Sequence, residues 1–372
     1  MHIDFRGCVV NEPEIRAGVV GCGSHAFRNI FPCFQFAHVN LLATCDLDQT
    51  RAETYARRFG ADHAFTDYRR MLERVELDAV FVILGYDDQG RPQYPQVAID
   101  CMERGAHVWI EKPPAATVAE IDRMADVAAA TGRQAMVGFK KMFFQPNRKA
   151  KSIMGDPAFG NPVVATLHEP HAIPTSSDYA AYLDRGEYNR DVLWFLDHVC
   201  HPVSAMVYLF GGPETMTFQR CDRNGAGVAT FCYAGDGPVV SVVFTAAQAD
   251  NGGRDRILIV SDRNQHVVVD NNLRVMWHRG RAGQSVFPYG ATPDFYAAPP
   301  EQASAVWEPE FSLGQLYNKG IFLLGYYGEI EHFAQAILAD RPVEHGTLAH
   351  ARTITRIFQA FASGPDKTIR LA

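Results

Sequence analysis

The sequence predicts an α/β protein, with an N-terminal doubly wound parallel sheet and a C-terminal α+β domain built on a largely antiparallel open sheet. Three observations support this fold class. Short apolar runs alternate with helical stretches from residue 16 to 137, a glycine-rich turn follows the first run, and strand-like runs succeed one another in the second half. Strands alternating with helices form parallel sheets, whereas strands joined by tight turns pair antiparallel. We therefore expect two domains, residues 1–143 and 144–372.

The composition is that of an ordinary folded protein. The chain has 372 residues, 47% hydrophobic and 21% charged, which is enough for two domains with their own cores. The formal net charge of -7 argues against a nucleic-acid partner, which would require clustered lysine and arginine. No apolar run approaches the roughly 18 residues that span a bilayer, so we expect no membrane partner. The eight cysteines form no CxxC pair, which favours reduced thiols in the cytoplasm.

Strands and helices alternate in the first half. Runs such as "DAVFVIL" are short and continuously apolar, as is typical of strands in a parallel sheet with both faces covered. The more polar stretches between them are long enough for covering helices. The predicted strands are 17–23, 39–46, 77–84, 106–112 and 134–139, and the predicted helices run from the glycine turn to Phe34 and over 49–59, 95–103 and 118–130.

The second half lacks this alternation. Strand-like runs follow one another with turn residues between them, which predicts antiparallel pairing of consecutive strands. The predicted strands are 161–170, 215–221, 227–234, 237–247, 256–262, 266–270 and 273–279, and the predicted helices are 147–154, 191–210, 326–338 and one after Thr347. Glycine and proline are frequent over 279–300, which predicts a long loop of functional or mobile character.

The glycine-rich turn predicts a dinucleotide site. Gly21, Gly23 and Ala26 have the G-x-G-x-x-A spacing directly after the first strand, where a helix N-terminus donates to phosphates. Asp46 ends the second strand and would bond the ribose hydroxyls of NAD, which indicates a Rossmann domain. Arg51 lies nearby and leaves NADP as an alternative. The expected cofactor-binding residues are Gly21, Gly23, Ser24, His25, Ala26, Asp46, Leu84, Gly85, Glu111 and Lys112.

A glutamate and a lysine follow directly on a buried strand. Glu111 and Lys112 stand after "HVWI", and burying either charge alone would be costly. Ligands of open α/β sheets bind beyond the carboxyl ends of strands, so Lys112 can polarise an oxygen beside the nicotinamide. Glu111 then either pairs with Lys112 or holds the chain against the cofactor. The alternative interpretation is a solvated turn.

The helix 191–210 carries a second pair. Asp197 and His201 are spaced i, i+4 and share one face, so Asp197 can orient an imidazole that takes a hydroxyl proton. Pro202 removes a helical hydrogen bond and is expected to kink the helix or end it there. The alternative interpretation is an ion pair on the helix surface.

Together these motifs resemble a family. The glycine turn, Asp46, "ERGAHVWIEKPPAATVAEID", "VGF", Asp197 with His201, and "YYGEIEHFAQAILADRPV" are similar to the Gfo/Idh/MocA oxidoreductases, which include glucose-fructose oxidoreductase and inositol dehydrogenase. The resemblance implies hydride transfer between NAD or NADP and a hydroxyl-bearing carbon of a sugar or cyclitol, with Lys112, Asp197 and His201 as catalytic residues. It also implies that the open sheet makes the contacts of a homodimer or homotetramer.

The chain departs from the family pattern near the expected substrate. The segment "LGYDDQGRPQY" stands where the family often has a proline after the fourth strand, and Tyr94 stands where histidine is common before the following helix. Asp191, Val192, Leu193 and Val199 occupy positions that are glycine in the family, which should narrow or reshape the pocket. The sequence leaves open which sugar or cyclitol reacts, at which carbon and in which direction.

Further residues are weaker candidates for substrate contact. They are Lys140, His168, Asp191, Trp194 and His198. His168 and Glu169 are adjacent on a predicted strand and face opposite sides, so we expect no metal site there.

Three functions compete. A dehydrogenase would release NADH in proportion to the substrate oxidised. An enzyme that recycles tightly bound NAD during glycoside elimination or epimerisation would not. A sugar- or dinucleotide-sensing regulator would not need Lys112, Asp197 and His201.

Overall fold

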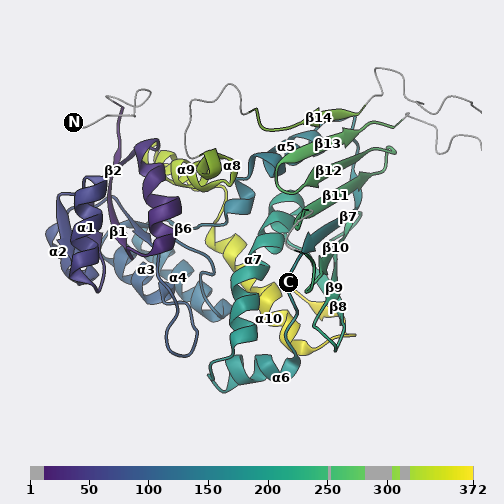
Figure 1. Ribbon diagram of the computed structural model, residues 1–372, viewed down its shortest axis with the longest axis horizontal. Coiled ribbons are helices and arrows are strands. Elements are labelled where there is room, and N and C mark those ends of the chain that lie inside the picture. The colour runs from purple at the N-terminus through teal and green to yellow at the C-terminus, as the bar shows by residue number, and fades with distance from the viewer. Residues whose placement is uncertain (1–11, 250–252, 281–303, 311–318, 372) are drawn as a thin grey trace, which may run out of the picture. The chain divides into compact units, whose positions relative to one another are not determined.

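In the computed structural model, the structure describes residues 12–249, 253–280, 304–310 and 319–371 (Figure 1). The chain forms two compact units that are each described by themselves. The first comprises Met1–Phe143, Ser177–Ser204 and Asn318–Gln359, and the second comprises Phe144–Ser176, Ala205–Tyr317 and Ala360–Ala372. The division into domains at residue 143 stays a prediction. Most of the predicted loop at 279–300 lies outside the described residues.

The first unit contains a six-stranded parallel sheet with the strand order β3-β2-β1-β4-β5-β6. Its strands are β1 Ile15–Val20, β2 Val39–Cys45, β3 His63–Phe65, β4 Ala79–Val82, β5 His107–Ile110 and β6 Ala135–Val137. This order confirms the predicted doubly wound sheet. The sequence did not predict β3, because this strand has three residues, none of them buried, and leaves no apolar run.

Four helices connect these strands. They are α1 Gln49–Phe59, α2 Tyr68–Arg74, α3 Tyr94–Glu103 and α4 Val118–Thr131. Of these, α1, α2 and α4 begin with a side-chain cap. The Asp48 side chain accepts from Arg51 N at the start of α1, and Thr117 and Glu120 form a capping box at the start of α4. The expected single helix after the glycine turn is instead a π-helical turn, η1 Ala26–Ile30, followed by the 3₁₀ helix η2 Phe31–Gln35. Pro32 lies in this second helix and has no N–H for a regular α-helical bond.

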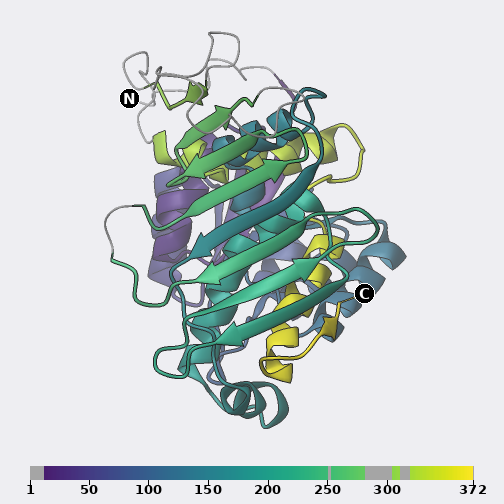
Figure 2. The same ribbon diagram turned by 90° about the vertical axis from the view of Figure 1, so that its right-hand side faces the viewer.

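The second unit is built on a nine-stranded sheet with the order β14-β13-β12-β11-β7-β10-β9-β8-β15 (Figure 2). The strands are β7 Pro162–Glu169, β8 Thr215–Arg220, β9 Gly227–Cys232, β10 Val239–Phe244, β11 Arg256–Ser261, β12 His266–Asp270, β13 Arg274–His278, β14 Ala305–Trp307 and β15 Ile369–Arg370. Among the described strands of this sheet, only β7 and β10 pair in parallel; the other pairs are antiparallel, which confirms the predicted class. β7 lies between β10 and β11, so these two consecutive strands do not pair. The helix α5, Gln145–Met154, packs on β12 and β13.

The helix α7 runs from Arg190 to Phe210. It continues through Pro202, so the expectation that the helix could end there is wrong. Its residues Val192, Phe195, Leu196 and Val199 are buried and form the apolar stripe that holds a helix against a core. By length and composition, α7 is the one described helix that could cross a membrane; 67% of its most apolar stretch is buried in the protein, as in a core helix.

The remaining helices follow late in the chain or join longer elements. They are α6 Ser176–Tyr179, η4 Ala180–Asp184, η3 Lys140–Met142, α8 Lys319–Leu323, α9 Tyr326–Leu338, α10 Leu348–Ala360 and η6 Phe361–Ser363. In the first unit Phe333 of α9 lies edge-on to Phe81 of β4, with ring centroids 5.7 Å apart, and both are fully buried. This packing places α9 on the same sheet whose strand ends carry the predicted site.

Candidate active site

The glycine turn after β1 has the backbone shape that the sequence predicts. Gly21 has a φ of 102°, and a Cβ there would lie 1.9 Å from Ile83 O, so only glycine fits. A Cβ at Gly23 would meet no atom within 4 Å, which leaves open space beside the turn. Cys22 N donates to Asp46 Oδ2 at 2.9 Å and ties the turn to the end of β2. The turn therefore fits a dinucleotide.

Asp46 accepts from main-chain N–H groups and lies beside a cation. Its Oδ1 accepts from Asp48 N at 3.0 Å and lies 3.3 Å from Nε of Arg51. A carboxylate here would bond ribose hydroxyls and repel an added phosphate, whereas Arg51 would attract one. Asp46 therefore fits the ribose of NAD, and Arg51 is close enough to bind the additional phosphate of NADP.

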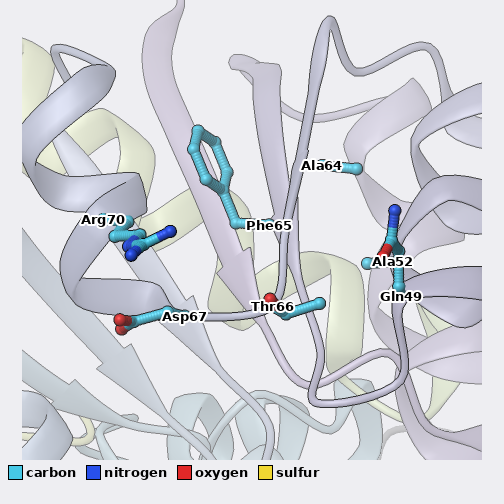
Figure 3. A pocket seen from close by; sticks show the side chains of 7 residues that line it. All are labelled: Gln49, Ala52, Ala64, Phe65, Thr66, Asp67 and Arg70. Carbon is cyan, nitrogen blue, oxygen red and sulfur yellow. The ribbon is translucent and has the colours of Figure 1, made fainter.

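A hollow of about 230 Å³ lies at the ends of β3 and α1 (Figure 3). In this view Arg70 and Asp67 stand on one side of Phe65 and Thr66, and Ala64, Ala52 and Gln49 on the other. None of the predicted site residues lines this hollow. It is thus not the place where the candidate catalytic residues meet.

Lys112 and Asp197 form an ion pair at the end of β5. Lys112 Nζ donates to Asp197 Oδ1 at 2.9 Å and to the main-chain oxygen of the same residue at 3.3 Å. Burial lowers the pKa of the ammonium group, but Asp197 and then Glu111 outweigh it and raise this pKa above its ordinary value. Burial alone would raise the pKa of Asp197, but the charge of Lys112 and the hydrogen bond from Tyr86 have the larger effect, so this pKa is lower than its ordinary value. Both groups are therefore charged at neutral pH.

Tyr86 joins this pair, and the sequence did not predict it. Its hydroxyl donates to Asp197 Oδ1 at 2.7 Å. The only sequence signal was that Tyr86 lies in "LGYDDQGRPQY", the segment that departs from the family pattern. In the described part of the chain, the hydrogen bonds of the Asp197 carboxylate go to Lys112 and Tyr86 and not to His201. The expected Asp197–His201 pairing is therefore not seen, although the two residues share a helix face.

Glu111 contacts the glycine turn. Its Oε1 lies 2.7 Å from His25 Nε2, and its Oε2 accepts from Lys112 N at 2.8 Å. The residue is only 4% exposed. Asn29 Nδ2 lies 3.2 Å from His25 Nδ1, so the ring is held at both nitrogens. Of the two roles left open for Glu111, this geometry favours holding the chain at the cofactor turn.

His201 lies on α7 beside a stacked aromatic pair. Burial, and then the positive charge of Lys112 and Lys140, lower the pKa of His201 well below its ordinary value, so the imidazole is neutral at pH 7. Its ring centroid lies 6.2 Å from that of His198. His198 stacks on Trp194 at 5.4 Å with an interplanar angle of 7°, and Trp194 is 56% exposed.

The other predicted residues are placed as follows. Lys140 Nζ donates to Tyr326 OH at 2.9 Å, and burial lowers the pKa of this lysine. Ser24, Gly85 and Asp191 are exposed, Leu84 O accepts from Tyr94 OH at 2.6 Å, and Ala26 is fully buried. His168 is on β7 in the second unit. No group of three or more His, Cys, Asp or Glu side chains gathers around a metal position in the ranges that the structure describes.

Sequence comparison assigns the N-terminal part of the chain to a family. Residues 15–139 match the family described as "Oxidoreductase family, NAD-binding Rossmann fold" (GFO_IDH_MocA). The uncharacterized oxidoreductase YrbE of Bacillus subtilis is 21% identical over 262 residues, 70% of each protein. Myo-inositol 2-dehydrogenase of Thermotoga maritima is 24% identical over 165 residues, 44% of this chain and 48% of that enzyme.

Solved structures share the fold over nearly the whole chain. A dehydrogenase from Chromobacterium violaceum has a TM-score of 0.74 at 24% identity and matches 95% of this chain and 96% of its own. An oxidoreductase from Agrobacterium radiobacter, solved with NAD+, L-tartaric acid and magnesium, has a TM-score of 0.73 at 11% identity, covering 96% and 98%. Residues 15–139 therefore belong to the GFO_IDH_MocA oxidoreductase family with its NAD-binding Rossmann fold, and the solved structures show that the similarity in fold extends over nearly the whole chain.

Proposed function

We propose that this protein is an NAD-dependent dehydrogenase that oxidises a hydroxyl-bearing carbon of a sugar, sugar derivative or inositol. The Lys112–Asp197 ion pair carries the proposal, because it fixes an ammonium group at the end of a central strand, where ligands of such sheets bind. The name of the myo-inositol 2-dehydrogenase relative supports the substrate class.

Each residue of the candidate site has a role in the oxidation direction. His201 is neutral and takes the hydroxyl proton of the substrate. Lys112 is charged and donates a hydrogen bond to the same oxygen, which stabilises the negative charge that develops there. Asp197 keeps Lys112 in place as its counterion. Gly21, Gly23 and Asp46 would hold NAD, which supplies the hydride acceptor when bound.

Substrate contacts follow from the same helix. Trp194, one helical turn before Asp197, is exposed and stacks on the half-buried His198, which gives a flat aromatic surface suited to the apolar face of a sugar ring. Lys140, Asp191 and His168 remain proposed contacts. The substrate's identity depends on these side chains and on the loop after β4.

We also propose that the protein is a homodimer or homotetramer formed through the sheet of the second unit. Several valines on this sheet are exposed: Val164 of β7 and Val239 of β10 are paired neighbours, and Val228 and Val306 are exposed elsewhere on the sheet. In Val239→Lys, the buried charge should shift the mass measured by multi-angle light scattering toward the monomer. Ser152→Lys, at an exposed position of α5 outside the sheet, is the control for added charge. An unchanged mass in Val239→Lys would contradict this interface.

The first experiment follows NADH fluorescence with the purified protein, NAD and a panel of hexoses, pentoses, inositols and simple glycosides. NADH formed in proportion to one substrate supports the dehydrogenase. Binding of NAD with turnover of a glycoside and without net NADH would instead indicate a recycled cofactor. Binding of NAD with no turnover of any compound would favour a regulator.

A further inference from the structure

The loop between β4 and α3 has a fixed shape of its own. Tyr86 and Pro92 form an antiparallel bridge at its base. Asp87 N donates to Arg91 O at 2.9 Å, Gly90 N donates to Asp87 O at 2.9 Å, and Asp87 Oδ1 accepts from Arg91 N at 2.8 Å. These bonds close the loop on itself, so the position of Tyr86 does not depend on a bound ligand.

Contacts with the segment before α7, in the same unit, anchor this loop. The hydroxyl of the buried Tyr182 donates to Gly90 O at 2.8 Å, and Arg91 donates back to Tyr182 O at 3.1 Å. Gly90 has a φ of 76°, and a Cβ there would lie 3.2 Å from the Tyr188 ring, so the loop packs closely. Tyr86 is thus held by a scaffold at both ends of the loop.

The Tyr86 hydroxyl and the Lys112 ammonium group share one acceptor. Both donate to Asp197 Oδ1, at 2.7 Å and 2.9 Å. The other carboxylate oxygen, Oδ2, lies 3.6 Å from His198 Nδ1. An aspartate at i and a histidine at i+4 can pair on a helix, yet His201 is not the partner here. Something other than helical spacing therefore decides where this carboxylate points.

We propose that Tyr86 is a positioning residue of the candidate active site, whose hydroxyl holds the Asp197 carboxylate on Lys112 and away from His201. The proposal rests on the proposed function only in taking Lys112 as the catalytic cation. Burial, and then the charge of Asp197, raise the pKa of Tyr86 well above its ordinary value, so the hydroxyl keeps its proton. Tyr86 acts through Asp197 and does not itself exchange a proton with the substrate.

The test measures Lys112 directly and needs no substrate. Acetic anhydride modifies only deprotonated lysine, and peptide mass spectrometry gives the rate at each site, with the exposed Lys367 as internal reference. In Tyr86→Phe the freed carboxylate should stabilise the buried ammonium group less. Lys112 should then react about fivefold faster, the factor that corresponds to one hydrogen bond of ordinary strength. Tyr86→Met also lacks the hydrogen-bond donor and should accelerate the acetylation of Lys112 to the same extent. It replaces Tyr86→Phe in the test if that variant does not fold.

The expected direction follows from the groups around Lys112, because a carboxylate of Asp197 that turns away from Lys112 raises the pKa of this lysine less. Asp197 and Glu111 raise its pKa, Cys200 adds to this when ionised, and burial lowers it. Lys140 is the neighbouring cation, and its own pKa is lowered in part by Lys112. None of these groups is altered in Tyr86→Phe. Asp197→Asn removes the counterion itself and should accelerate Lys112 at least as much.

A matched tyrosine provides the control. Tyr182→Phe removes a hydroxyl that anchors the same loop but leaves the Tyr86–Asp197 bond intact, so Lys112 should react at the wild-type rate. An unchanged Lys112 rate in folded Tyr86→Phe, or equal acceleration in both variants, would overturn the proposal. With a substrate from the panel, Tyr86→Phe should lower kcat and leave KM unchanged. If no substrate is found but the labelling result holds, the proposed function fails and the role of Tyr86 in holding Asp197 stands.

Discussion

The carboxylate of Glu111 at the end of β5 lies 2.7 Å from Nε2 of His25, in the turn after β1. The two residues are 86 positions apart in the sequence. Their contact joins the strand that carries Lys112 to the turn that fits a dinucleotide. Glu111 is almost fully buried and the His25 side chain is 37% exposed, so the link is shielded from water on the Glu111 side.

Glu111→Gln should weaken NAD binding. The amide keeps the shape of the side chain but loses the charge that strengthens the bond to His25, so the glycine turn is held less firmly. We expect the Kd for NAD, measured by isothermal titration calorimetry, to rise about tenfold. Glu120→Gln, in the capping box of α4, is the control and should lower stability without changing this Kd.

Lys112→Ala and His201→Ala should each lower kcat by at least about 10²-fold, the usual scale for a general acid or base. The Kd for NAD should change little, because the phosphate and ribose contacts lie elsewhere. Steady-state NADH formation with the substrate from the panel measures the effect. Lys367→Ala, on the surface of the second unit, should keep full activity. Near-normal turnover in both active-site variants would contradict the assignment.

Asp46→Ala should move cofactor preference toward NADP. The substitution removes the acceptor for the ribose hydroxyls and frees Arg51, now 3.3 Å from Asp46, for a phosphate. We expect the ratio of the Kd for NAD to that for NADP to rise at least about tenfold. In Asp46→Ala with Arg51→Ala the gain for NADP should disappear. A gain that persists without Arg51 would show that another group binds the phosphate.

Glu329→Gln should stabilise the protein as pH rises. Glu329 is fully buried, and neither carboxylate oxygen has a hydrogen-bond partner among the described residues. Burial, and then Glu111, raise its pKa well above the ordinary value, so the folded state holds a proton that the unfolded state loses above about pH 4.5. Wild-type stability therefore falls with increasing pH, and the uncharged glutamine removes this loss.

Melting temperatures of the wild type and Glu329→Gln at pH 5 and pH 8 test this linkage. The difference in favour of Glu329→Gln should be larger at pH 8. Glu331→Gln is the matched control on the same helix. Glu331 pairs with His38, so neutralising it should lower the melting temperature of the protein. Equal differences at both pH values would mean that Glu329 ionises normally.

Much of the fold followed from local sequence patterns. Strands β1, β4 and β5 and the glycine turn are local features of the sequence. A buried strand requires apolar residues at its own positions, and the positive φ at position 21 requires glycine there. The resemblance to a family and the class of cofactor followed from the order of the motifs along the chain. Short or exposed elements such as β3 were missed because they leave no apolar run, and the position of β7 between β10 and β11 is a long-range pairing without a local signal.

By itself the sequence determined the parallel sheet, the dinucleotide turn and the residue types of the candidate site. Only the tertiary structure decided which of these residues pair. Helical spacing allowed Asp197 to face His201, but a lysine 85 positions away and a tyrosine 111 positions away take its carboxylate instead. Glu111 likewise bonds to His25 rather than to the neighbouring ammonium group. The physical reason is that a buried charge takes whichever partner the fold brings within hydrogen-bond distance, and separation along the chain does not encode that distance.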